Sequence, residues 1–248
     1  MRKYIIGIIF IVLFMSSCEN NRYKSGNIVT VERPYTGFNG VSLEGKGIIY
    51  LKQGDQFVFK AKAPEYVLDI IDVTVRKGVL TISYLENLSS DFIPEFTIEL
   101  PQLSYLGVEG AAIVKMGNTF TGNQITIESK GATAAEVYVD VNNLTIKAGG
   151  NSVVVLNGEA SVLEAEIKGK TELRARDFIA EKAVIKSTGF TKSEIGVKEF
   201  LDVTISGHGN VKYNGTPKIS TSIAGAGRIE SGNYEPARDK KQAAAAEE

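Results

Sequence analysis

The sequence has one cysteine, Cys18, one histidine, His208, and no tryptophan among its 248 residues. A single cysteine excludes an internal disulfide, and a single histidine excludes a metal site built from several histidines. The 28 basic and 29 acidic residues nearly balance, and no basic stripe with aromatics suggests nucleic-acid binding. No segment has the apolar spacing of a convincing amphipathic helix. We therefore expect no metal, no cofactor and no nucleic-acid partner.

The first eighteen residues, MRKYIIGIIFIVLFMSSC, combine a basic start, a short apolar run and small residues. The apolar run is too short to span a bilayer, so the order of these features indicates a signal peptide over residues 1–17. The stretch before Cys18 resembles the lipobox of bacterial lipoproteins, with Met15 where leucine is usual. We expect lipidation of Cys18, and the alternative is plain cleavage that leaves a free thiol. Acyl chains on Cys18 would make the membrane a partner of the mature protein.

Polar segments flank the central part of the chain. Residues 18–36 start with the anchor cysteine and continue as a polar tether. Residues 233–248 carry charges and an alanine run without apolar partners, which predicts a disordered tail or a loose helix. Loss of Arg2 and Lys3 with the signal peptide would change the net charge from −1 to −3.

Between these ends the chain repeats a short alternating strand, a glycine and a second strand, as in LTIKAGGNSVVVLNG at 144–158. The spacings between successive strand-ending glycines are 21, 19, 19, 20, 18 and 18 residues. Glycine accepts a positive φ at sharp corners without a Cβ penalty. The glycines are Gly110, Gly131, Gly150, Gly169, Gly189, Gly207 and Gly225.

The residues two, four and six positions before each glycine are almost all apolar or small and share one strand face. We predict that they point inward in an all-β, right-handed β-solenoid (β-helix) of about 19-residue rungs over residues 104–232. The expected inward residues are Ser104, Leu106, Val108, Ile125, Ile127, Ser129, Leu144, Ile146, Ala148, Leu163, Ala165, Ile167, Ala183, Ile185, Ser187, Leu201, Val203, Ile205, Ile219, Thr221 and Ile223.

The outward position three residues before each corner glycine supports the same register. Its central members alternate in charge, as Glu128, Lys147, Glu166 and Lys186. Stacked one strand spacing apart, about 4.8 Å, these residues would form a favourable ladder.

Residues 37–103 are less regular. The stretch Asn39–Gly45 fits the rung pattern, with Asn39, Val41 and Leu43 inward. Longer strands starting at Phe57, Val73 and Phe96, with a hairpin turn at Lys77-Gly78, predict an irregular antiparallel part. This part could cap the solenoid or form a separate small domain.

Several motifs resemble the head GIN domain family of auto-transporter-like adhesins. They are GKGIIYLKQGD at 45, KGVLTISY at 77, FTIELPQLSYLGVEGAAIV at 96, LDVTISGHGNVKYNGTP at 201 and SIAGAGRIESG at 222. The resemblance covers about residues 37–232 and implies an all-β, solenoid-like envelope protein of Gram-negative bacteria, commonly with a lipoprotein signal. It implies no catalytic residues. Lys170 and Phe190 depart from the pattern, which usually has a second small residue at these corners.

The chain offers few candidates for chemistry. Glu164 and Glu166 share a strand face and could serve an inverting glycosidase, but Glu166 also belongs to the charge ladder. We interpret His208, between two glycines, as an exposed turn residue. Tyr105, Tyr138, Phe190 and Tyr213 are expected on or near outward positions, where rings can stack on sugars or anchor an interface.

The sequence therefore predicts a non-catalytic, lipid-anchored envelope protein, an adhesin or binding module that presents a rigid face. Its partner would be a glycan, an envelope protein or a host protein, and it would be an outer-membrane lipoprotein on the cell surface or the periplasmic face. The alternatives are a carbohydrate-active β-helix enzyme that uses Glu164 and Glu166, and a periplasmic structural scaffold.

Overall fold

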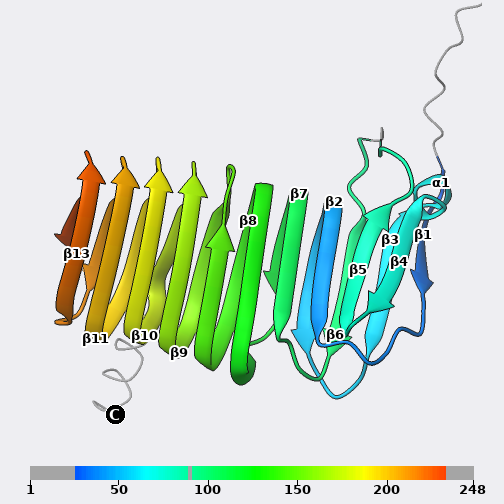
Figure 1. Ribbon diagram of the computed structural model, residues 1–248. Helices are drawn as coiled ribbons and strands as arrows, with labels where there is room; N and C mark the ends of the chain where they lie inside the picture. Colours follow the sequence, from blue (N-terminus) through cyan, green and yellow to red (C-terminus); the bar gives the residue numbers. More distant parts are fainter. Residues whose placement is uncertain (1–25, 89–90, 233–248) are drawn as a thin grey trace, which may run out of the picture.

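The computed structural model describes residues 26–88 and 91–232. About 75% of these residues are in strands and 2% in helix (Figure 1). The predicted signal peptide, Cys18 and the tail 233–248 lie outside the described residues, as does the first part of the tether. The elements in chain order are β1 (Ile28–Glu32), β2 (Gly40–Gln53), β3 (Val58–Pro64), α1 (Glu65–Leu68), β4 (Ile71–Arg76), β5 (Val79–Tyr84), β6 (Glu95–Leu100), β7 (Tyr105–Met116), β8 (Phe120–Ala148), β9 (Val153–Gly169), β10 (Glu172–Gly189), β11 (Lys192–Gly207), β12 (Asn210–Asn214), β13 (Lys218–Gly225) and β14 (Arg228–Ser231).

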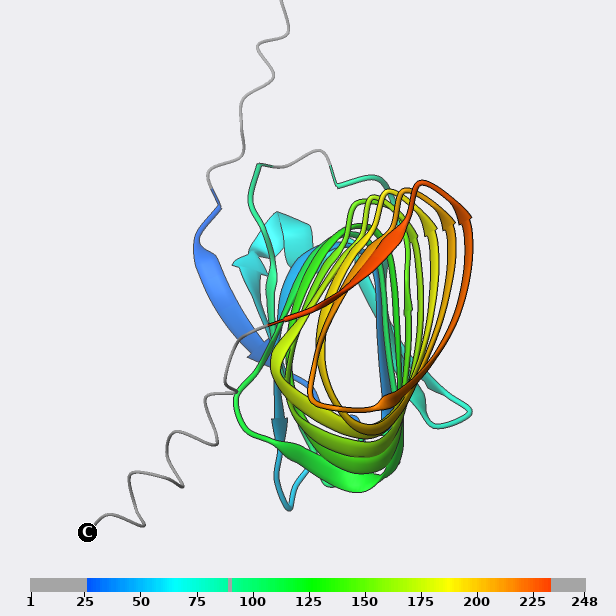
Figure 2. The ribbon, with the colours of Figure 1, turned by 90° about the vertical axis from the view of Figure 1, so that its left-hand side faces the viewer.

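The long strands wind into a β-solenoid of about six turns with rungs of about 20 residues. Parallel pairing runs in the order β2, β7, β8, β9, β10 and β11, with β12 and β13 on β11 and β14 on β12. Seen along the axis, the rungs superimpose as stacked loops (Figure 2). The predicted all-β solenoid is confirmed, and the rung length is close to the expected 19 residues.

The seven predicted corner glycines all have a positive φ, between 75° and 116°. They also stack on one another. A Cβ on Gly131 would lie 2.5 Å from the Gly110 carbonyl oxygen, and one on Gly150 would lie 2.6 Å from the Gly131 carbonyl oxygen. The column begins at Gly45, the end of the stretch Asn39–Gly45 that fits the rung pattern, because Gly45 contacts Gly110 in the same way. Glycine is thus required here both by the backbone conformation and by the close approach of neighbouring rungs.

Most of the expected inward residues are buried in one continuous apolar core that extends from Phe38 to Val211. Ile127, Ile146, Ile185 and Val203 are 0% exposed. The side chains stack in register on their equivalents in adjacent rungs, which explains why the apolar columns recur at the rung period.

Two groups of expected inward residues are exposed instead. Ser104 and Asn39 lie at the start of their rungs, where Ser104 donates backbone and side-chain hydrogen bonds to the Asn39 carbonyl. Ile219, Thr221 and Ile223 do align with inward residues of β11, but no further rung covers them within the described residues. The predicted burial was therefore wrong for these five residues.

Buried hydroxyl groups line the inner side of the corners. Ser129, Thr133 and Ser152 hydrogen-bond to one another over 2.5–3.0 Å, and Ser152 also donates to the Gly149 carbonyl at 2.7 Å. Two corners later Ser187 pairs with Thr191. Mutual hydrogen bonds offset the cost of burying these hydroxyls and place polar groups where the chain turns.

At the N-terminal end, antiparallel strands join the solenoid. The pairs β1–β3, β3–β6 and β4–β5 are antiparallel, whereas β5 and β6 also pair in parallel with β2. The predicted hairpin turn is present, since Lys77 and Gly78 have φ values of 51° and 77°. Rings of Tyr35, Phe59 and Phe96 pack together beneath these strands.

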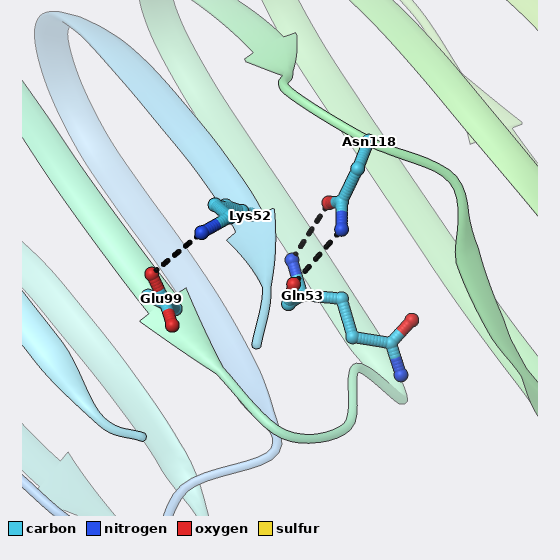
Figure 3. Close-up of polar contacts among 4 residues, drawn as sticks. All are labelled: Lys52, Gln53, Glu99 and Asn118. Atoms are coloured by element: carbon cyan, nitrogen blue, oxygen red, sulfur yellow. Dashed lines mark hydrogen bonds and ion pairs between the residues drawn. The ribbon is translucent and has the colours of Figure 1, made fainter. Parts of the chain in front are cut away.

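A polar clamp links this end to the solenoid (Figure 3). The Asn118 side chain accepts from the Gln53 backbone N–H at 2.9 Å and donates to the Gln53 carbonyl at 2.8 Å. The Gln53 side chain donates to the Pro101 carbonyl, and Lys52 pairs with Glu99 at 3.3 Å (Figure 3). Asn118 thereby pairs with β2 as a strand backbone would, at the point where β7 has ended.

Candidate functional site

The outward charge ladder lies on the strand that precedes the corner glycines. Lys147 and Glu166 are in register, as are Glu166 and Lys186. The Lys147 ammonium contacts the Glu128 carboxylate at 3.0 Å, and Lys168 contacts Glu166 at 2.5 Å. The predicted alternation is therefore present in space, and it binds adjacent rungs together at the surface.

Glu166 belongs to this ladder, whereas Glu164, two residues earlier on the same strand, aligns with Thr145 and Val184. A hydrogen bond and the charge of Lys168, with smaller contributions from Lys186 and Lys147, lower the pKa of Glu166. A glycosidase acid needs a carboxyl group whose pKa is raised by its surroundings. The environment of Glu166 acts in the opposite direction, so this carboxylate does not suit the role of the acid.

A different surface forms at the corners themselves. Each residue that follows a corner glycine donates its backbone N–H to the glycine carbonyl one rung below, at 2.8 Å for Asn151, Lys170, Phe190 and His208. These four residues therefore form one outward column. Phe190 and His208 stack with ring centroids 4.8 Å apart and an interplanar angle of 13°, which matches the rung spacing of about 4.8 Å.

The stacked pair borders a groove of about 470 Å³. Phe190 is 68% exposed, so its ring is available to a ligand. The other wall consists of the outward residues that begin the next strands, where Glu172 aligns with Lys192, and Lys192 with Asn210. The groove thus combines an aromatic face with a polar wall, as small-molecule and glycan sites commonly do.

The charged residues of the groove are mostly cationic. Lys170, Lys192 and Arg228 line the groove together with one acid, Glu172, and Arg228 is paired with Glu230 at 2.8 Å. A hydrogen bond from Arg174, with its charge and that of Lys192, lowers the pKa of Glu172, so this carboxylate stays ionised and engaged within the protein. The groove therefore has a net positive character that suits an anionic group on a ligand.

The four aromatic residues predicted as a binding surface do not lie together. Phe190 occupies the corner groove, whereas Tyr105 is half-buried against Gly107 on the strand before an earlier corner, with its hydroxyl donating to Glu128 at 3.3 Å. Tyr138 follows another corner and donates to Glu136 at 2.5 Å. Tyr213 aligns with the buried Ile195 and packs against the core, so its expected outward position is wrong.

The interpretation of His208 as an exposed turn residue did not include the ring of Phe190, against which His208 stacks. The signal was available in the chain, because Phe190 and His208 each follow a corner glycine and stand 18 residues apart, which is one rung. The polar wall shows the same signal, because its residues Glu172, Lys192, Asn210 and Arg228 are spaced 18 to 20 residues apart, which is one rung.

Among residues 26–88 and 91–232, no group of three or more His, Cys, Asp or Glu side chains could hold a metal ion. Over the same residues, no helix is long and apolar enough to cross a membrane.

Residues 37–217 match the family described as putative auto-transporter adhesin, head GIN domain. The chain belongs to the head GIN domain family. This match confirms the resemblance drawn from the glycine-corner motifs. No curated protein matches the sequence.

Solved structures share the fold of this head GIN domain protein. A putative adhesin from Bacteroides fragilis superimposes with a TM-score of 0.80 at 25% identity, covering 84% of this chain and 98% of that one. A putative lipid binding protein from Parabacteroides distasonis gives a TM-score of 0.67 at 18% identity, with the same coverage of 84% and 98%. A putative adhesin from Parabacteroides merdae gives 0.62 at 18% identity, again covering 84% and 98%. The family and these neighbours are described as adhesins or binding proteins and not as enzymes.

Proposed function

We propose that this protein is a non-catalytic binding module of the bacterial cell envelope that holds an anionic glycan in the corner groove. The observation that carries the proposal is the exposed Phe190–His208 stack beside the lysines and arginine of the groove. Membership of an adhesin family supports binding as the general role. The lowered pKa of Glu166 supports a structural role for this carboxylate, because a glycosidase acid needs a raised pKa.

The proposed ligand class follows from the chemistry of the groove. Aromatic rings contact the apolar faces of sugar rings, and the Phe190–His208 stack extends an apolar aromatic surface over two rungs. Lys170, Lys192 and Arg228 would pair with the carboxylates or sulfates of an acidic polysaccharide. A repeating polymer would also suit a site whose elements themselves repeat at the rung spacing of about 4.8 Å.

The binding test is a glycan array that includes uronic-acid and sulfated polymers, probed with the native protein and with Phe190→Ala. The matched control is Phe200→Ala, because Phe200 is also exposed, at 39%, and does not line the groove. Binding that is lost in Phe190→Ala and retained in Phe200→Ala supports the proposal. Equal binding by all three proteins would place the glycan site elsewhere, and no binding across the array would refute the ligand class.

Anchoring belongs to the same proposal. Residues 1–17 would be removed as a signal peptide, and Cys18 would carry the lipid. The segment between Cys18 and β1 would tether the solenoid to the outer membrane, since Ile28–Glu32 of the expected tether pair with β3. The test is metabolic labelling with a fatty acid, compared between the native protein and Cys18→Ala. Protease treatment of intact cells then separates two roles, since digestion from outside supports an adhesin, whereas protection until the outer membrane is opened favours the periplasmic scaffold.

A further inference from the structure

The two strands at the C-terminal end of the solenoid have an unused edge. β13 pairs only with β11, and β14 pairs only with β12, within residues 26–88 and 91–232. Ile219 and Ile223 are 41% and 43% exposed, although they align with the fully buried Leu201 and Ile205 one rung below. This open end faces the viewer in Figure 2. An unpaired strand edge with apolar residues is a template for pairing with another chain.

The sequence of this edge is self-complementary. Residues 219–223 read Ile-Ser-Thr-Ser-Ile, which is the same in both directions. If two copies of β13 pair antiparallel about Thr221, each Ile219 meets an Ile223 of the other copy and each Ser220 meets a Ser222. The apolar core would then continue across the junction, because these isoleucines lie in the inward columns.

The charges of the second edge strand, β14, are also self-complementary. Arg228 and Glu230 point outward on either side of Ile229, which aligns with the buried Val211, and they pair with each other at 2.8 Å within one chain. Antiparallel pairing about Ile229 places each Arg228 opposite a Glu230 of the other copy. Opposite charges at directly facing positions stabilise an antiparallel pair.

Both pairings satisfy one symmetry operation. Thr221 stands four residues before the corner glycine Gly225, and Ile229 stands four residues after it. A single two-fold axis that crosses the end rung through these two residues therefore brings both strands into register at once. A closed two-fold contact of this kind uses the same surface on both partners, as most homodimers do.

We infer that two copies of this protein associate through the C-terminal ends of their solenoids by antiparallel β13–β13 and β14–β14 pairing. At the opposite end β5 and β6 cover the rung formed by β2, and the outermost strands β1 and β4 pair antiparallel with β3 and β5, so the edges there do not continue the parallel rungs. The dimer would be a continuous solenoid with its N-terminal ends outward. It goes beyond the proposed ligand binding and would present two corner grooves on one rigid body.

Cysteine cross-linking tests the register. Full-length Thr221→Cys should form a disulfide-linked dimer on mild oxidation, because directly opposed antiparallel residues have Cβ atoms about 4.5–5.5 Å apart. The matched control is Ile223→Cys, whose two copies would be offset by four residues, about 13 Å along the strand. The native chain reports any cross-link that Cys18 makes alone. Cross-linking of Thr221→Cys no greater than that of the control or the native chain would overturn the inference.

Charge reversal tests the second strand without changing the first. Arg228→Glu and Glu230→Arg should each weaken the dimer, by about tenfold or more in dissociation constant, since each brings like charges together at two symmetric places. An equimolar mixture of the two variants should restore the dimer, because every facing pair is then opposite in charge. Sedimentation of the full chain in mild detergent measures both effects, and a mixture no tighter than its components would contradict the pairing.

The alternative occupant of the edge is the segment 233–248 of the same chain. Deletion of this segment should leave cross-linking of Thr221→Cys unchanged. Cross-linking that appears only after the deletion would refute the dimer of the full chain and assign the edge to the tail.

Discussion

The glycine column gives the sharpest test of how this fold is held together. Gly149 and Gly150 are adjacent, yet only Gly150 belongs to the column. Its φ is 85°, and a Cβ there would lie 2.6 Å from the Gly131 carbonyl oxygen and 2.9 Å from the Gly131 nitrogen. A Cβ on Gly149 would meet nothing within 4 Å, and its φ is outside the left-handed range. Alanine at the two positions therefore adds the same methyl group with different consequences.

The magnitude follows from two terms for Gly150→Ala. Holding a residue with a side chain in this sparsely populated backbone region costs about 1–3 kcal/mol. The methyl group also pushes the neighbouring rungs apart, which strains the hydrogen bond from the Asn151 N–H to the Gly131 carbonyl, now 2.8 Å, and costs roughly 0.5–1.5 kcal/mol more. We expect a loss of about 2–4 kcal/mol in the free energy of unfolding.

Gly149→Ala should change the stability by less than about 1 kcal/mol and could raise it, because alanine restricts the unfolded chain. Guanidinium unfolding followed by circular dichroism measures both variants against the native protein. Equal effects of the two substitutions would refute the reasoning, as would a loss below about 1 kcal/mol for Gly150→Ala.

Three further predictions concern the core and two titratable groups. Ile146→Asp should destabilise the fold by several kcal/mol, because the side chain of Ile146 is 0% exposed and the substitution places a charge in the core. In the same unfolding assay the outward substitution Thr126→Asp should cost less than about 1 kcal/mol. The hydrogen bond and charge of Lys168 lower the pKa of Glu166 from 4.5. The stabilisation that the ionised carboxylate gives the fold is therefore complete above about pH 4.5 and is lost as the pH falls through the lower pKa of the folded state. The small difference in stability between the native protein and Glu166→Gln should disappear in acid. Burial raises the pKa of Tyr84 above 10.0, so the native fold favours the neutral phenol and should lose stability as the pH rises past about 10, and Tyr84→Phe should show a shallower decline between about pH 9 and about pH 11.

The repetitive part of the fold could be predicted because each rung repeats the same physical requirements. Corner glycines, apolar inward positions and the Glu128–Lys147–Glu166–Lys186 ladder all recur at one period, so each pattern checks the others. Errors occurred where the repeat begins or ends. Ser104 enters its rung with its backbone bonded to Asn39, and Ile219 lies on the last rung with nothing above it.

The candidate site was harder to predict because it depends on stacking between rungs and not on spacing within one strand. In the sequence Phe190 stands out only for its aromatic ring, and a lone histidine such as His208 carries little information. Only alignment of the residues after each corner glycine places the two rings together. Tyr213 failed for a related reason, since its inward orientation is set by pairing with Ile195 on the preceding rung.

The single histidine offers the most direct measurement of the proposed function. His208 gives the only imidazole signals of the chain in proton NMR, and its ring lies against Phe190 in the groove. We predict that an acidic polysaccharide shifts these signals progressively and saturably, and that Phe190→Ala weakens the apparent affinity while Phe200→Ala does not. Saturable binding of the polysaccharide with the His208 signals unmoved would contradict the assignment of the corner groove as the binding site.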